Sequence, residues 1–214
     1  MGLKTLNKRE NKKFLIIFRI IYLIIGIIAI LTSFIFPEAY HPTNFYERFI
    51  VLINFFTIQS NIIAIFVMGL SLIYLIKNKS PIYLDKLRLG AVSYLTITMI
   101  VFNLFLASIS SNSYHFPSIA EHLILPLMLI IDWLIDPQRK PIRILNSIYY
   151  GIYPIFYFIW TQIVGYYYNW YPYFFINPII TSKLNLIINI IILLIFFITI
   201  VNIFNLRYKK ENKI

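Results

Sequence analysis

The sequence predicts an all-α, polytopic integral membrane protein with six transmembrane helices and with both termini in the cytoplasm. Hydrophobic residues make up 60% of the 214-residue chain and charged residues only 13%, whereas about a quarter of the residues in a soluble domain are charged. Six apolar windows reach the length of roughly 20 residues that a helix needs to cross a bilayer. The only charged residues inside these windows are Arg19, Glu121 and Asp132. We therefore expect a single membrane domain over residues 1–214.

The six windows follow one another with ordinary boundaries between them. The first ends before Pro37, and its apolar run is too long for a cleaved signal peptide. The second ends in a turn at residues 77–81, and the fourth lies between Pro117 and Pro137. The runs do not alternate between polar and apolar residues, as the strands of a membrane barrel would, so we interpret them as helices. The predicted spans are residues 14–36, 49–76, 89–110, 118–135, 144–164 and 184–206.

Basic residues alternate between the two sides of these spans. Of the 19 lysines and arginines, 17 belong to the N-terminal segment, the second and fourth connections and the C-terminal segment, which leaves Arg48 and Lys183 on the other side. Cytoplasmic connections carry such an excess, so both termini are expected in the cytoplasm. On its own, the net charge of +11 would suggest that the protein binds nucleic acid. Topology and attraction to anionic lipid explain the charge instead, so we expect membrane lipid and no nucleic acid as a partner.

Polar side chains inside the spans mark a candidate site, because such groups are costly at membrane depth. Thr57 lies roughly 12 Å below the outer edge, His122 about 6 Å and Asn103 about 10 Å. These three residues can therefore meet in the outer half of the bilayer. Asp132 lies about 15 Å from His122 along one helix and cannot join them. Three further polar residues on the second span are Asn54, Ser60 and Asn61, and Asn54 and Asn61 share one predicted helical face with Thr57.

A hydroxyl and an imidazole at comparable depth permit nucleophilic catalysis. The Thr57 hydroxyl needs a base to take its proton, and histidine is the usual base near neutral pH, which points to His122. Amide groups could then stabilise an oxyanion. The candidate oxyanion or polar-support residues are Asn54, Ser60, Asn61 and Asn103.

Each candidate also has a structural interpretation. Thr57 could bond the carbonyl four residues earlier or pack at a helix interface, as threonines in membrane helices often do. Glu121 and His122 could form an ion pair, a proton relay or an interhelical clamp. His115 and His122 lack the spacing of a zinc site on one helix, and the chain has no cysteine. We therefore expect no metal and no cofactor.

Two further features lie near the ends of the spans. The aromatic cluster at residues 166–173 fits an interfacial belt, and its density also allows a pocket lid. At the opposite end of the fourth span, Asp132 and Trp133 are expected to anchor the helix. Arg139 and Arg143 are the expected partners that neutralise Asp132 or Asp136.

Three segments carry a resemblance to a known family. They are Asn54-Phe-Phe-Thr57-Ile-Gln-Ser60-Asn61, His122-Leu-Ile-Leu-Pro126 with Asp132-Trp133, and the stretch from Trp160 through Trp170-Tyr171-Pro172-Tyr173-Phe174. In their order and placement they resemble the six-helix androgen-induced-gene/ADTRP-type family, whose bacterial members are called Pr6Pr family membrane proteins. The proline stands one place nearer the histidine than in the animal pattern, as Pro126.

The resemblance implies a function as well as a fold. Animal members of the family are intramembrane threonine hydrolases that cleave fatty-acid esters of hydroxy fatty acids. When the family's motifs are matched to this sequence, Thr57 corresponds to the nucleophile and His122 to the base. The resemblance also implies an acyl-ester substrate and a location in a bacterial plasma membrane.

Two functional hypotheses follow from different classes. A membrane-embedded lipid esterase predicts the Thr57 hydroxyl close to His122 and a lateral opening wide enough for an acyl chain. A non-enzymatic membrane protein, such as a small transporter, a lipid binder or an assembly partner, predicts that the polar residues of the second span pack against another helix without a cavity. Broken helices or repeat symmetry, which are typical of transporters, are not evident in the sequence.

Overall fold

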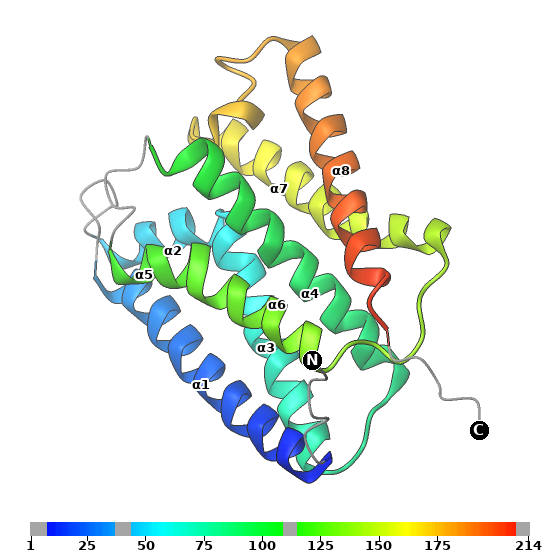
Figure 1. Cartoon of the computed structure of the whole chain (residues 1–214). Helices are drawn as coiled ribbons and strands as arrows, with labels where there is room; N and C mark the ends of the chain where they lie inside the picture. Colours follow the sequence, from blue (N-terminus) through cyan, green and yellow to red (C-terminus); the bar gives the residue numbers. More distant parts are fainter. Residues whose placement is uncertain (1–7, 37–43, 109–114, 209–214) are drawn as a thin grey trace.

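The structure is a computed structural model that describes residues 8–36, 44–108 and 115–208. Within these ranges the protein is all-α (Figure 1). A helix satisfies its own backbone hydrogen bonds, which an apolar chain in lipid requires. The α-helices are α1 (Lys8–Ile35), α2 (Phe45–Ile53), α3 (Phe56–Ile76), α4 (Ile82–Val101), α5 (Phe116–Ile119), α6 (Leu125–Ile135), α7 (Ile152–Tyr168) and α8 (Lys183–Asn205). Two short π-helices adjoin these: η1 (Phe102–Leu106) continues α4, and η2 (Ala120–Ile124) joins α5 to α6. Two further elements, η3 (Ile144–Gly151) and η4 (Phe174–Ile176), are 3-10 helices.

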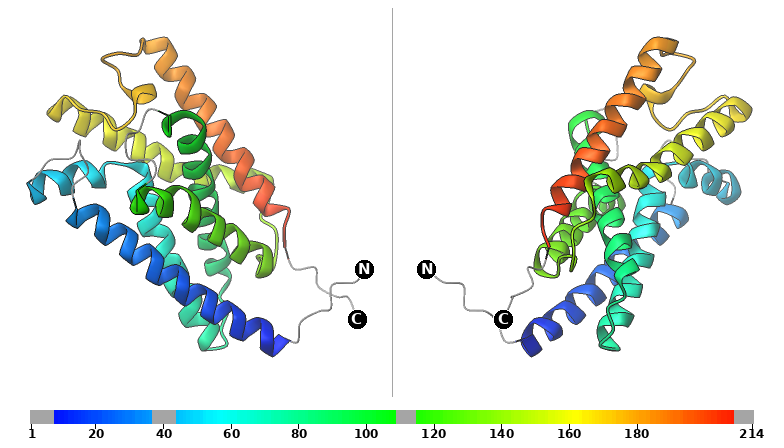
Figure 2. Two further views of the ribbon diagram at one scale, coloured as in Figure 1. Left: turned by 60° about the vertical axis from the view of Figure 1, so that its left-hand side comes forward. Right: turned by 90° about the vertical axis from the view of Figure 1, so that its right-hand side faces the viewer.

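Helices α1, α3, α4 and α6 form a bundle, and α8 packs against α4 on its outer side. Helices α7 and α8 splay apart toward the connection that joins them (Figures 1 and 2). The core between the bundle helices contains large side chains that are almost completely buried, among them Tyr22, Leu89, Leu125 and Trp133. The outward faces are apolar as well, with Phe66 65% and Ile192 57% exposed. A bundle that is apolar on both its inner and outer faces is suited to lipid rather than to water.

Five helices in the described part of the chain are long and apolar enough to cross a membrane. They correspond to the first, second, third, fourth and sixth predicted spans, and they indicate a membrane-embedded protein. Their bounds are Glu10–Ile35, Phe56–Ile76, Ile82–Leu106, Phe116–Ile135 and Lys183–Asn205.

Two of the predicted spans are not continuous helices, and the prediction is wrong in this respect. The second window is divided into α2 and α3 by a break at Asn54 and Phe55. The fifth window consists of the 3-10 helix η3 followed by α7, which has 17 residues. Hydropathy is a sum along the chain, so it does not detect a change of backbone geometry inside an apolar run.

The third span is displaced from its predicted position. It begins at Ile82 rather than at residue 89. Arg88, which was predicted to lie in the preceding connection, is buried inside the bundle. Its predicted end at residues 109–110 lies outside the described residues, as do the basic residues 4, 209, 210 and 213 of the two terminal segments.

An ion-pair cluster joins α1, α4 and α6 at one end of the bundle. Arg19 pairs with Asp132 at 2.7 Å and with Asp136 at 2.8 Å, and Arg88 pairs with the same two carboxylates at 2.7 and 3.2 Å. Arg19, Arg88 and Asp132 are all buried. Two arginines and two aspartates balance in charge, which makes their burial tolerable. The cluster therefore anchors the end of α6, as predicted for Asp132.

The predicted partners of these aspartates are wrong. Arg139 pairs with Asp85 at 2.8 Å, and Arg143 is exposed just before η3. The arginines that neutralise Asp132 and Asp136 come from α1 and α4, which are remote in sequence.

Candidate active site

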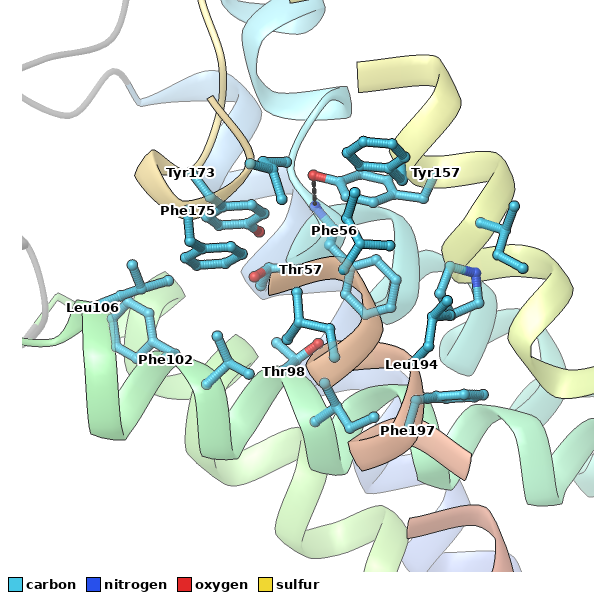
Figure 3. A pocket seen from close by; sticks show the side chains of 18 residues that line it. Phe56, Thr57, Thr98, Phe102, Leu106, Tyr157, Tyr173, Phe175, Leu194 and Phe197 are labelled. Atoms are coloured by element: carbon cyan, nitrogen blue, oxygen red, sulfur yellow. Dashed lines mark hydrogen bonds between the residues drawn. The ribbon is translucent and has the colours of Figure 1, made fainter. Parts of the chain in front are cut away.

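The break between α2 and α3 brings Thr57 into the first turn of a helix. Phe55 is extended, with φ −79° and ψ 131°, so the backbone groups around it lack helical partners. Tyr157 of α7 supplies two of these partners. Its hydroxyl donates to the Asn54 carbonyl at 2.9 Å. The same hydroxyl accepts from the Phe56 N–H at 3.2 Å (Figure 3). A broken helix at membrane depth is tolerated where such contacts satisfy the freed groups.

Asn54 ends α2 rather than sharing a helical face with Thr57 and Asn61, so that prediction is wrong. Its side-chain amide donates to the Ile50 carbonyl at 2.6 Å, and its side-chain oxygen accepts from the Trp160 indole at 2.7 Å. Asparagine competes in this way for backbone partners. The side chain of Asn54 therefore stabilises the break and links it to α7.

Thr57 and His122 lie in direct contact. The Thr57 hydroxyl oxygen is 3.2 Å from Nε2 of His122. On the other side of the ring, Nδ1 of His122 lies 2.9 Å from the backbone carbonyl of Ser118. A carbonyl oxygen only accepts, so Nδ1 carries the proton and Nε2 is the acceptor that faces Thr57. This arrangement is that of a nucleophile with an oriented general base.

His122 stands in a π-helical turn, a geometry that is frequent at functional sites. Its ring stacks on Phe102 of the other π-helix, η1, with ring centroids 3.5 Å apart and an interplanar angle of 14°. This stacking fixes the plane of the imidazole. Neither Phe102 nor Ser118 is among the site residues predicted from the sequence, although Ser118 precedes His122 by four residues, about one helical turn.

The amides of Asn61 and Asn103 support the turn that carries His122. The Asn61 amide donates to the carbonyls of Thr57 at 2.9 Å and Glu121 at 3.2 Å. The Asn103 amide donates to the carbonyls of Met99 at 2.8 Å and His122 at 3.2 Å. An amide NH2 has two hydrogens, so each group uses both of them on backbone oxygens. The structure thus gives the two amides positioning contacts.

Ser60 and Glu121 lie beside the pair and bond groups on neighbouring elements. The Ser60 hydroxyl donates to the Thr57 carbonyl at 3.1 Å and contacts the Thr98 hydroxyl at 3.1 Å. Glu121 accepts a hydrogen bond from Ser33 of α1 at 2.8 Å. This contact between α1 and η2 fits the interhelical clamp, one of the three interpretations given above for Glu121 and His122.

Thr57 faces an apolar cavity of about 150 Å³. Residues of α3, α4, η1, α7, η4 and α8 line it, and most of them are apolar (Figure 3). Its polar side chains are Thr57, Thr98, Tyr157 and Tyr173. The cavity lies where α7 and α8 splay apart, so it is suited to an apolar chain with a single polar group at Thr57.

The connection between α7 and α8 covers the Thr57 end of this cavity. Phe55 packs edge-on against Trp170 and Tyr173, with ring centroids 5.6 and 5.8 Å apart. The ring of Tyr171 lies so close to Gly165 that a Cβ there would overlap it. We refer to residues 170–176 as the aromatic cap. Of its aromatic residues, Tyr173 and Phe175 line the cavity, whereas Tyr166 and Tyr167 of the same cluster are 79% and 78% exposed.

The phenol of Tyr173 points from the cap toward Thr57 (Figure 3). Its oxygen interacts with the hydroxyl and the backbone N–H of Thr57. Enclosure of this phenol raises its pKa above the usual value, although the contacts with Thr57 oppose the shift. The group therefore remains protonated at neutral pH. The resemblance segment contained Tyr173, but only the fold shows which of the clustered tyrosines reaches Thr57.

Comparisons with protein-family models, with curated proteins and with solved structures found no match to this chain.

Proposed function

We propose that the protein is a membrane-embedded lipid esterase with Thr57 as nucleophile and His122 as general base. The observation that carries this proposal is the 3.2 Å contact between the Thr57 hydroxyl and Nε2 of His122, at the polar end of an apolar cavity. A non-enzymatic protein would need neither a base oriented toward a hydroxyl nor a cavity beside it.

The proposed reaction proceeds in two steps. Nε2 of His122 takes the Thr57 proton while the hydroxyl oxygen attacks the ester carbonyl carbon, and the leaving alcohol receives the proton from His122. This step leaves the acyl group on Thr57. Water, deprotonated by His122, then attacks the acyl carbon, releases the carboxylic acid and restores the Thr57 hydroxyl.

The substrate class follows from the cavity and from the resemblance. The lining is apolar apart from a few hydroxyl groups, which suits a fatty acyl chain, and Thr57 stands where the ester would lie. The resemblance to the androgen-induced-gene/ADTRP-type and Pr6Pr proteins favours fatty-acid esters of hydroxy fatty acids. We extend the proposal to this substrate class and to family membership.

The same reasoning extends to topology. We infer six crossings of a bacterial plasma membrane, with η3 and α7 together as the fifth, and both termini in the cytoplasm. In support, Lys12 near the start of α1 bonds Asn78 at the α3–α4 connection at 2.7 Å. Arg207 after α8 bonds the Leu134 carbonyl near the end of α6 at 3.0 Å. These four segments therefore belong to one end of the bundle, where the basic connections gather.

The test is covalent labelling of the purified protein with a fluorophosphonate. Thr57 attacks phosphorus, fluoride leaves, and the proton passes to His122, so mass spectrometry should find the phosphonyl group on the peptide that contains Thr57. Thr57→Ala should abolish labelling, and Thr199→Ala should not, because Thr199 is exposed on α8 and bonds only the Ile195 carbonyl. Equal labelling of wild type and Thr57→Ala, or none in either, would contradict the proposal and favour the non-enzymatic alternative.

A further inference from the structure

The proposed esterase needs a donor for the oxyanion that forms at the ester carbonyl. Such donors commonly contribute about 10²–10³ in rate. The amides of Asn61 and Asn103, which the sequence suggested for this task, each direct both hydrogens to backbone carbonyls. The Tyr157 hydroxyl donates to the Asn54 carbonyl at 2.9 Å. These three groups are therefore committed to holding the backbone.

We infer that the phenol O–H of Tyr173 donates a hydrogen bond to the oxyanion formed when Thr57 attacks an acyl ester. This inference rests on the proposed function. The phenol of Tyr173 points toward Thr57, and both side chains line the cavity (Figure 3). A carbonyl oxygen bound beside Thr57 would thus meet the phenol.

The start of α3 adds a second donor at the same place. The first backbone N–H groups of a helix have no acceptor within the helix, and the helix dipole favours negative charge there. Tyr157 accepts the N–H of Phe56, and the Tyr173 phenol lies near the backbone N–H groups of both Phe56 and Thr57. An incoming carbonyl oxygen can accept from the Thr57 N–H in place of Tyr173, which then donates its own hydrogen to the same oxygen.

Contacts on both sides hold Tyr173 in position before substrate binds. Its ring stacks on Phe175 with centroids 5.3 Å apart and an interplanar angle of 3°. The backbone that follows is tied to α7 and α8, since Gln162 donates to the Ile176 carbonyl at 3.0 Å and Asn189 donates to the Phe175 carbonyl at 2.9 Å. A donor held in this way needs no reorganisation during the reaction, which is the condition for effective oxyanion stabilisation.

The experiment compares Tyr173→Phe with Tyr166→Phe in the full-length protein. Tyr166→Phe removes a hydroxyl from an exposed tyrosine of α7, outside the cap and the cavity. The probes are p-nitrophenyl octanoate and a fluorophosphonate. For Tyr173→Phe we expect kcat to fall by about 10²–10³ with little change in KM, and the labelling rate of Thr57 to fall in parallel. Tyr166→Phe should remain close to wild type. A kcat and a labelling rate for Tyr173→Phe within about twofold of wild type would overturn the inference.

A second variant separates donation from support of the fold. Replacement of Tyr173 by 3,5-difluorotyrosine keeps its shape and makes the O–H a stronger donor, so the labelling rate should exceed that of wild type. An unchanged rate would overturn the inference even if Tyr173→Phe failed to fold. Failure of the esterase proposal is distinguishable, because then the wild-type protein itself would not be labelled at Thr57.

Discussion

The side-chain amide of Asn103 donates a hydrogen bond to the backbone carbonyl of His122 at 3.2 Å. Four residues after His122 stands Pro126, which has no N–H to offer that carbonyl as a helical partner. Asn103 therefore supplies the donor that the proline lacks, and it does so from η1, the π-helix whose Phe102 stacks on the imidazole. The position of His122 thus depends on a neighbouring helix.

Loss of this support should slow the reaction. We expect Asn103→Leu to lower the fluorophosphonate labelling rate of Thr57 by about tenfold to a hundredfold, because a small displacement of a catalytic group has effects of this size. Labelling kinetics on purified protein measure the effect. Asn146→Leu, at an exposed position of η3, is the matched control. Equal rates for the two variants would show that Asn103 does not position His122.

Removal of the base should have a larger effect. His122→Gln keeps a polar side chain but provides no group that takes the Thr57 proton, so hydrolysis of p-nitrophenyl octanoate should fall by about 10²–10⁴. His115→Gln is the control, because His115 lies exposed at the start of α5. If both variants retained the wild-type rate, a different group would have to activate Thr57.

The Tyr157 hydroxyl should matter for stability as well as for rate. Tyr157→Phe leaves the Asn54 carbonyl and the Phe56 N–H without their partner. A buried unsatisfied polar group costs about 1–3 kcal/mol, so unfolding in detergent should require less denaturant, and labelling of Thr57 should slow. Tyr149→Phe, at a side chain 68% exposed, should match wild type in both measurements. A stable Tyr157→Phe variant would mean that other groups satisfy the break.

The ion-pair cluster should contribute stability without affecting catalysis. Arg19→Met removes one of the two arginines that pair with Asp132 and Asp136, and removal of one partner from a buried pair typically costs about 3–5 kcal/mol. We expect a clear loss of thermal stability, while the labelling rate of the remaining folded protein stays near wild type. Lys13→Met, at an exposed position one to two turns earlier on the same helix, controls for loss of positive charge. A stability equal to that of the control would contradict the structural role of the cluster.

The proposed topology can be tested directly because the chain contains no cysteine. Lys79→Cys and Lys140→Cys lie in connections assigned to the cytoplasm, and Ile180→Cys lies in the connection between α7 and α8 on the opposite side. A maleimide that does not cross membranes should label only Ile180→Cys in intact cells and all three after lysis. Labelling of Lys79→Cys in intact cells would contradict the proposed orientation.

Several features could be predicted from the sequence because they depend on local composition. Apolar runs of sufficient length predicted the membrane class and the approximate positions of five long helices. The rise per residue placed Thr57, His122 and Asn103 at comparable depth, and the structure brings Thr57 to 3.2 Å from the imidazole of His122 and Asn103 to 3.2 Å from its backbone carbonyl. Depth along an unbroken helix follows from counting residues, but the count for Thr57 crossed the break at Asn54 and Phe55. Its contact with His122 therefore depends on how α3 packs against the fourth span.

Other features were decided by contacts between residues remote in sequence. The break at Asn54 exists where Tyr157 and Trp160 of α7 satisfy its polar groups, and the partners of Asp132 come from α1 and α4. Neither relationship is encoded in a hydropathy window, because side-chain partners depend on which helices pack together.

The amino-acid sequence by itself determined that this chain favours a helical, membrane-embedded form and that few polar residues lie within it. Only the tertiary structure decided how those residues are used. It assigned the amides of Asn61 and Asn103 to backbone carbonyls and brought Tyr173 of the aromatic cap to Thr57. The physical reason is that burial in lipid depends on the composition of each segment, whereas a polar group in a low-dielectric interior binds whichever partner the packing brings within reach.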